Sequence, residues 1–434
     1  MQMQTNSSEA KTILLLTTPQ SYRAKSFLTA AKKLGLQIVQ GVDLPQSLAE
    51  EWGVQLQLDF SQPETAVSHI LQFAKERPLT AVLPVDDAGA VLAARASQAL
   101  SLPHNNVGAA EAARDKLKMR QMLAAAGVNS PNFCPFALQE PTAHVVTQVT
   151  ATLGYPAVVK PLYLNGSRGV MRVNDEAELA AAVARLRQML PENGRFLVET
   201  YLPGVEVALE AVLENGRLHP LALFDKPDPL EGPFFEETIY VTPSRLPKAV
   251  QEQIVETAAA GAAALGLQLG SVHAELRVNG AEAWIVEVNG RSIGGLCSKT
   301  LRFDMGNMGD SELSLEELIL RQASGLPVGH LQREQQASGV MMIPIPHGGI
   351  LRGFSGMDAA KAVSGIDDVT ITAPLNNRLV PLPEGESYLG FIFASGDSPK
   401  FVEDALRQAH GRLHFAIDEE IRLSVISSQQ VSNQ

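Results

Sequence analysis

Short apolar runs alternate with segments of helical periodicity over the first hundred residues. The run at 11–18 (KTILLLTT) is typical of a buried parallel strand, and further strands are predicted at 36–40 and 79–85. Helices are predicted between them at 22–34, where Gly35 ends the pattern, and at 69–75 and 88–100. Strands that alternate with helices favour an open parallel sheet, so residues 1–110 are predicted to form an α/β domain.

The pattern changes twice further along the chain. One long helix is predicted at 109–126 and another at 176–189, with strands at 156–161 and 195–202. Two hairpins follow: 206–213 with 218–224 around Asn215-Gly216, and 271–278 with 284–289 near Asn279-Gly280. After residue 326, short strands at 340–345, 349–354, 369–372 and 388–394, a helix at 398–409 and a strand at 413–417 predict a small α+β unit. The polar segment 427–434 is predicted to be disordered.

Composition narrows the class of protein. The chain has 434 residues, 45% of them hydrophobic and 19% charged, which is typical of a globular protein with several domains. No window approaches about 18 uninterrupted apolar residues, and the first ten residues are polar, so we expect neither a membrane span nor secretion. Two cysteines exclude a disulfide framework and favour the cytoplasm. A net charge of −12 without a basic run argues against nucleic-acid binding.

The second hairpin carries two carboxylates. With a period of two, His273, Glu275 and Arg277 share a face, while the alternate residues, Trp284 and Val286 among them, are predicted to face the core. A two-residue turn at Asn279-Gly280 places Glu275 opposite Trp284, whereas a five-residue loop places it opposite Glu287. Like charges directly opposite each other need a cation between them, and oxygen ligands suit Mg²⁺. The alternative is two glutamates on a solvated face.

Three further motifs could carry chemistry. Lys160 precedes the loop Asn165-Gly166-Ser167-Arg168-Gly169, whose backbone could approach phosphate oxygens; the alternative is an ordinary surface loop. Glu199 ends a strand before Tyr201 and Leu202, where open backbone could contact an adenine edge. Arg291 lies among Gly290, Gly294 and Gly295 and could bind an anion or pair with a carboxylate. Cys297 is interpreted as a packed thiol, because no base stands at a matching spacing.

Taken in order, these motifs resemble the ATP-grasp superfamily over residues 1–325, most specifically in HAELRV…AWIVEVNGRSIGG. The segments 232–244 and 339–393 resemble the bacterial L-amino acid ligases and carnosine-synthase-like enzymes. Gly290 is a departure, because many relatives have alanine there. The resemblance implies an α/β and α+β ATP-grasp architecture: a domain with a parallel sheet at 1–110, an ATP-grasp domain at 111–325 with a mobile lid at about 156–200, and a C-terminal unit at 326–426.

The resemblance also implies roles for individual residues. ATP phosphates would be held by Lys116, Lys160 and the lid residues Gly166, Ser167, Arg168 and Gly169, adenine by Glu199, Tyr201 and Leu202, and ribose by Glu206. Glu275, Glu287 and Asn289 would bind Mg²⁺ or Mn²⁺. Glu237 would meet the ammonium of an amino acid, although Glu236 is adjacent and a slip of one residue exchanges their faces. Arg291, with Gly294 and Gly295, would hold the substrate carboxylate and act in catalysis.

The implied activity is ATP-dependent joining of a carboxylate to an amine through an acylphosphate. The substrates would be small molecules, amino acids among them, with no nucleic-acid or membrane partner, and a homodimer is left open. The alternatives are another ATP-grasp branch, such as biotin-carboxylase-like or purine-biosynthetic chemistry, and a nucleotide-binding module without catalysis.

Overall fold

A computed structural model describes residues 11–19, 21–49, 51, 54–304, 312–328, 332–333, 336–385 and 387–419. The tail predicted at 427–434 lies outside the described residues. The N-terminal part is a parallel sheet in the order β3-β2-β1-β4, as the alternating pattern predicts. Its elements are β1 (Thr12–Thr17), α1 (Ala24–Leu34), β2 (Gln37–Asp43), α2 (Gln46–Ala49), β3 (Leu56–Leu58), α3 (Pro63–Glu76), β4 (Ala81–Pro84) and α4 (Ala90–Ala99).

The predicted helix 109–126 is wrong as a single element, because it is two helices, α5 (Val107–Ala112) and α6 (Lys116–Ala125). Asp115 breaks the run: its side chain accepts hydrogen bonds from the backbone N–H groups of Leu117 at 2.9 Å and Lys118 at 3.2 Å. An aspartate that caps a helix in this way competes with continuation of the preceding one. The break makes Lys116 the first residue of α6.

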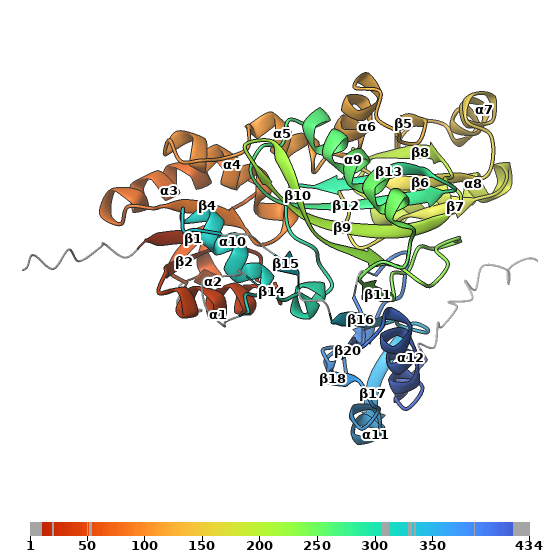
Figure 1. Ribbon diagram of the computed structural model, residues 1–434. Helices are drawn as coiled ribbons and strands as arrows, with labels where there is room; N and C mark the ends of the chain where they lie inside the picture. The colour runs from red at the N-terminus through yellow and green to blue at the C-terminus, as the bar shows by residue number, and fades with distance from the viewer. Residues whose placement is uncertain are drawn as a thin grey trace, which may run out of the picture.

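A small four-stranded antiparallel sheet follows, in the order β5-β8-β6-β7, with two helices packed against it. Its elements are β5 (Phe133–Ala137), α7 (Thr142–Thr152), β6 (Ala157–Pro161), β7 (Met171–Val173), α8 (Glu176–Met189) and β8 (Arg195–Thr200). Helix α8 has the predicted bounds. Figure 1 shows this unit at one end of the molecule and the N-terminal sheet at the other.

An eight-stranded sheet in the order β13-β12-β9-β10-β11-β16-β20-β18 runs between them. The strands are β9 (Val205–Glu214), β10 (Arg217–Asp225), β11 (Ile239–Thr242), β12 (Gly270–Asn279), β13 (Glu282–Asn289), β16 (Ala337–Ile343), β18 (Ile366–Ile371) and β20 (Gly390–Gly396). Three strands predicted for the C-terminal unit therefore continue the sheet that the two hairpins begin. The helix α9 (Lys248–Ala264), which the sequence analysis missed, packs on its β12–β13 end.

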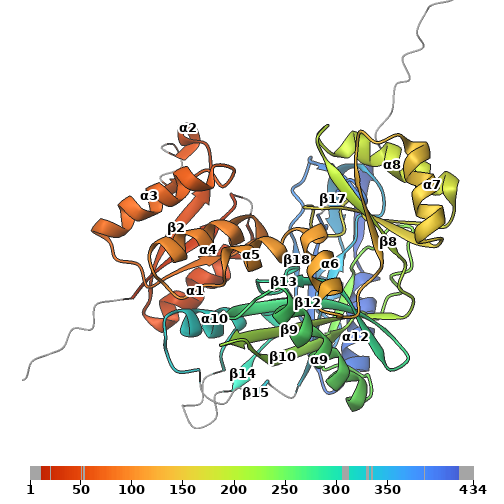
Figure 2. The same cartoon turned by 90° about the horizontal axis from the view of Figure 1, so that it is seen from above.

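The remaining elements close the two ends of this sheet. Helix α10 (Leu315–Ala323) shares a core with α1, and Lys33 of α1 pairs with Glu317 at 2.8 Å, so the N-terminal sheet is held beside the central one (Figure 2). The C-terminal residues add a second small sheet, β19-β17-β21, below it in Figure 1. The bounds are β14 (Phe303–Asp304), β15 (Gln332–Arg333), β17 (Gly349–Ser355), α11 (Met357–Lys361), β19 (Arg378–Leu379), α12 (Pro399–His410) and β21 (His414–Asp418). Among the described residues, no helix is long and apolar enough to cross a membrane.

Candidate active site

A cavity of about 610 Å³ lies where the N-terminal sheet, the β5-β8-β6-β7 sheet and the eight-stranded sheet meet. The carboxyl ends of β1 and β4 form one wall, and the loop after β6 forms another. Strands β9, β12 and β13 supply the floor, lined by polar side chains on one face while the opposite face packs against α9. Of the site residues predicted from the sequence, those that line the cavity are Lys116, Lys160, Gly166, Ser167, Glu199, Tyr201, Leu202, Glu206, Glu237, Glu275, Glu287, Asn289, Arg291, Gly294 and Gly295.

Two lysines reach the cavity from different elements. Lys160 Nζ lies 2.8 Å from Glu199 Oε2, and Arg120 Nε lies 2.7 Å from Glu199 Oε1. Glu199 is only 1% exposed, so its carboxylate is engaged within the protein by these two cations. Lys116 Nζ donates to the carbonyl of Leu164 at 2.9 Å.

The Arg120–Glu199 pair should dominate the acid stability of this region. Burial by itself raises the pKa of Glu199, but Arg120 and Lys160 outweigh it and lower the pKa from 4.5 to about 2. A lowered folded-state pKa stabilises the protein above the unfolded-state pKa, and that stability is lost as the pH falls from about 4.5 towards 2. We expect Arg120→Met to reduce the free energy of unfolding at neutral pH by about 3–5 kcal/mol, because it leaves a buried carboxylate short of a partner.

Urea unfolding followed by circular dichroism between pH 2 and 7 measures this effect. Lys118→Met on the same helix is the control, because Lys118 is 48% exposed and its pair with Glu111 should contribute only about 0–1 kcal/mol. An equal loss of stability in both variants would contradict the expectation.

The loop between β6 and β7 has three residues with positive φ. Gly166, Ser167 and Gly169 have φ values of 59°, 56° and 72°. A Cβ on Gly169 would come within 2.6 Å of Pro161 Cγ, so only glycine fits there. Gly169 N–H donates to the carbonyl of Pro383 at 2.8 Å, which joins this loop to the C-terminal residues. Gly166 and Ser167 line the cavity, whereas Arg168 and Gly169 lie outside its lining.

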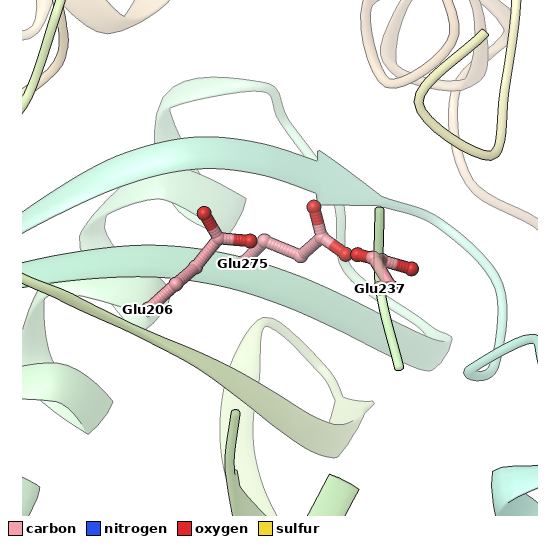
Figure 3. A group of neighbouring side chains, drawn as sticks. All are labelled: Glu206, Glu237 and Glu275. Carbon is pink, nitrogen blue, oxygen red and sulfur yellow. The ribbon is translucent and has the colours of Figure 1, made fainter. Parts of the chain in front are cut away.

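Three carboxylates converge on the floor of the cavity, as Figure 3 shows for Glu206, Glu237 and Glu275. Their nearest oxygens lie within 4.8 Å of one another. Lys226 follows β10 and points its ammonium into this group, 2.8 Å from Glu206, 2.6 Å from Glu237 and 3.1 Å from Glu275. A tethered ammonium thus neutralises part of a charge that would otherwise be repulsive.

Two carboxylates of this group, Glu237 and Glu275, have pKa values shifted in opposite directions. Burial raises the pKa of Glu237 to about 7, with Lys226 opposing the rise and Glu275 adding to it. Burial also acts to raise the pKa of Glu275, but Lys226 and His273 outweigh it, and the pKa falls well below its ordinary value. Glu275 is therefore more acidic than Glu237.

Of the two registers left open by the sequence, the pairing of Glu275 with Glu287 is the one present, but it does not arise from a five-residue loop. The turn is tight, with Asn279 opposite Glu282, and the register shifts by one residue at Val286, so that Glu275 faces Glu287. The same shift corrects the predicted core face: Ala283, Ile285 and Val288 are buried with α9, while Val286 lines the cavity. Separate lysines serve the two carboxylates, because Lys116 Nζ lies 3.3 Å from Glu287 Oε1 and Lys226 lies beside Glu275.

The adenine and ribose end predicted from the sequence is organised by Arg277. Its guanidinium donates to the hydroxyl of Tyr201 at 3.1 Å and the carbonyl of Leu202 at 3.0 Å, and lies 3.2 Å from Glu206. This one side chain therefore ties the segment after β8 to the start of β9.

Arg291 follows Asn289 into the glycine-rich segment and pairs across the cavity. Its Nε lies 2.8 Å from Asp87 Oδ2, beyond the end of β4. Burial lowers the pKa of Arg291, but Asp87 more than offsets this, and the net shift is upward. Gly295, at φ 58°, donates its N–H to the hydroxyl of Tyr22 at 3.1 Å. Both contacts come from the N-terminal sheet, so that sheet helps to position the segment.

Cys297 lies on the cavity wall but is poorly suited to be a nucleophile. It is 1% exposed, and burial raises the pKa of its thiol. Cys134 is also free and buried. Both observations agree with the interpretation of Cys297 as a packed thiol.

Sequence reasoning missed several charged residues of the site, above all Asp87, Arg120 and Lys226. Asp87 had a usable signal, because it follows β4 at the carboxyl edge of a parallel sheet, where such sheets bind ligands. Arg120 could have been noticed four residues after Lys116 on one helix face. Lys226 had no comparable signal, because a bulge decides its position.

Two family models match parts of this chain. The family model described as the ATP-grasp domain matches residues 153–300, which hold the loop after β6 and strands β8, β9, β12 and β13. The chain contains an ATP-grasp domain. A second family model, L-amino acid ligase C-terminal domain 2, matches residues 341–418.

Relatives extend the likeness beyond the ATP-grasp domain. Alanine–anticapsin ligase from Bacillus subtilis is 27% identical over 299 residues, which are 64% of this chain and 62% of that ligase. Carnosine synthase 1 from Gallus gallus is 30% identical over 355 residues, 76% of this chain and 37% of the synthase. The chain thus matches under two thirds of the length of either relative.

A solved structure matches the chain almost from end to end. The L-amino acid ligase from Bacillus licheniformis superposes with a TM-score of 0.75 at 26% identity, covering 94% of this chain and 99% of that one. The predicted resemblance to the ATP-grasp superfamily and its L-amino acid ligase group is therefore confirmed.

Proposed function

We propose that this protein is an ATP-dependent ligase that joins a carboxylate to an amine, with an amino acid among its substrates. The observation that carries the proposal is one cavity in which Lys116 and Lys160, the carboxylates of β12 and β13, and Arg291 come together. The names of the relatives, which are ligases of alanine and of other amino acids, support the same class of reaction.

The residues divide into a nucleotide end and a reacting end. Lys116, Lys160 and the backbone of the loop at Gly166 and Ser167 bind the phosphates, and the segment held by Arg277 accepts adenine and ribose, the latter at Glu206. Glu275, Glu287 and Asn289 offer only oxygen ligands, and each carboxylate already has a lysine ammonium within 3.3 Å, so the set suits Mg²⁺ or Mn²⁺. Such an ion supplies charge neutralisation at the phosphoryl oxygens.

A carboxylate has no good leaving group, so it must be phosphorylated before an amine can displace one of its oxygens. A carboxylate oxygen of the donor attacks the γ-phosphorus of ATP, ADP leaves, and an acylphosphate forms. The amine attacks the acyl carbon, the nitrogen loses a proton to the departing phosphate, phosphate leaves with the C–O bond electrons, and an amide remains. Arg291 stabilises the tetrahedral oxyanion that forms when the amine attacks and that collapses when phosphate leaves. Glu237 receives the ammonium of the donor. We also propose that the protein works in the cytoplasm, as its composition predicts.

A pairwise amino-acid screen for phosphate release, with mass spectrometry of the products, tests the function. We expect phosphate release to require two substrates and the product mass to equal their sum less water. Absence of amino-acid-dependent phosphate release across the screen would overturn the proposal.

We further expect the loop at 164–170 to gain hydrogen-exchange protection when Mg–ATP binds. Its glycines allow rearrangement at low cost, and backbone N–H groups that contact phosphate stop exchanging with water. Hydrogen exchange with mass spectrometry measures the change, with the peptide spanning the Asn215-Gly216 turn as the control. Equal protection of the loop with and without Mg–ATP would contradict its assignment to the lid.

A further inference from the structure

Arg23 is a buried cation that forms no ion pair with a carboxylate among the described residues. It is the N-cap residue of α1, is 6% exposed and lines the cavity. Its Nη1 donates to the carbonyl of Val85 at 2.7 Å, and its Nη2 donates to the hydroxyl of Ser292. Both partners are uncharged. Among the described residues, no carboxylate oxygen lies within the 4.0 Å of an ion pair with Arg23.

The other cations of the cavity differ in this respect. Arg291 has Asp87, Lys160 has Glu199, and Lys226 has three carboxylates. Burying a guanidinium without a counter-ion is costly, and Arg does not escape the cost by losing its proton. Burial lowers the pKa of Arg23, and the neighbouring charge of Arg291 lowers it further, while Asp86 and Glu316 oppose the shift only in part. A bound anion would relieve both effects.

The position of Arg23 narrows the kind of anion. It belongs to the N-terminal sheet and touches Ser292, one residue beyond Arg291. The lysines assigned to the ATP phosphates come instead from α6 and β6, and Arg291 is assigned to the reacting carboxylate. The anion at Arg23 is therefore neither the ATP phosphates nor the carboxyl assigned to Arg291, but a third group beside that carboxyl. An amino acid that serves as the amine brings such a group, its own carboxylate.

We propose that Arg23 binds the carboxylate of the amine-donating amino acid, in a subsite between Arg23 and the segment after Arg291. This inference rests on the proposed ligase function. Arg23 anchors that carboxylate with its fork of N–H donors, while the amine points towards the acylphosphate. The protein would then select free amino acids as acceptors and discriminate against those whose carboxyl group is blocked.

Arg23→Gln tests the subsite, with Lys25→Gln on the same helix as the control because Lys25 is exposed. Three acceptors are compared with one donor: an amino acid identified by the pairwise screen, its primary carboxamide, and hydroxylamine, which carries no carboxylate and traps acylphosphates. We expect Arg23→Gln to raise the KM of the amino acid about 10- to 100-fold, the effect of losing a charge-assisted hydrogen bond. The carboxamide and hydroxylamine should react as in the unaltered protein.

Other results would overturn the subsite or the ligase function on which it rests. An unchanged KM for the amino acid, or equal losses with all three acceptors, would overturn the subsite. A raised Kd for ATP or a raised KM for the donor as the main defect would also overturn it, because the anion would then be a phosphate or the donor carboxylate. If the unaltered protein releases no phosphate with any pair of amino acids, the ligase function itself fails, and the acceptor subsite fails with it. Thermal melting of Arg23→Gln close to that of Lys25→Gln excludes misfolding as the cause of a loss.

Discussion

Replacing Arg291 with lysine should reduce turnover by about 10²- to 10³-fold, the usual cost of removing one oxyanion donor. The guanidinium is held by Asp87 through Nε at 2.8 Å, which fixes the direction of its remaining N–H groups. Lysine keeps the charge but presents a single point in place of a planar fork. Arg291→Ala should lose at least as much. Binding of ATP should change little, since the lysines and the adenine segment lie on other elements.

Nucleotide affinity by calorimetry and amino-acid-dependent phosphate release separate these effects. Arg217→Lys is the matched control, because Arg217 is exposed at the start of β10. If Arg291→Lys turned over as fast as the unaltered protein, or if its main defect were loss of nucleotide binding, Arg291 would not belong to the reacting end.

Replacing Glu287 with glutamine should lower turnover by about 100-fold or more while the fold survives. The amide keeps the shape of the side chain but loses the charge that attracts both Lys116 and a divalent ion. Because Glu287 is 22% exposed and lines the cavity, water can solvate Lys116 after the change. The defect should therefore appear in the concentration of magnesium needed for activity and not in thermal stability.

Titrating phosphate release with magnesium measures this effect, and Glu282→Gln on the same strand is the control because Glu282 is exposed. A Glu287→Gln protein with an unchanged magnesium requirement and full turnover would take Glu287 out of the metal site.

Local pattern was sufficient for most of the fold. Period-two and 3.6-residue patterns act through near neighbours in the chain, so the parallel N-terminal sheet, helix α8 and both hairpins could be predicted. The turn at Asn215-Gly216 was predicted for the same reason: both residues adopt positive φ, 51° and 79°, which asparagine and glycine tolerate well. Of the site residues that the ordered motifs identified, all but Arg168 and Gly169 line the cavity.

Two single-residue register shifts could not be predicted from the sequence. In the first hairpin the shift at Leu221 carries Lys226, in place of Asp225, to the position opposite Glu206. In the second, the shift at Val286 brings Glu287 opposite Glu275. A slip of one residue exchanges the two faces of a strand, and its energy depends on how each face packs against α9 or the cavity.

The sequence by itself therefore determined which elements form and which residue types the site contains. Only the tertiary structure decided which charges meet: Lys226 with three glutamates, Arg120 with Glu199, Asp87 with Arg291, and Arg23 with no carboxylate. The reason is physical. Secondary structure depends on contacts within a few residues, whereas the partner of a buried charge is chosen by the packing of sheets that are distant in the chain, since an unpaired charge there is costly.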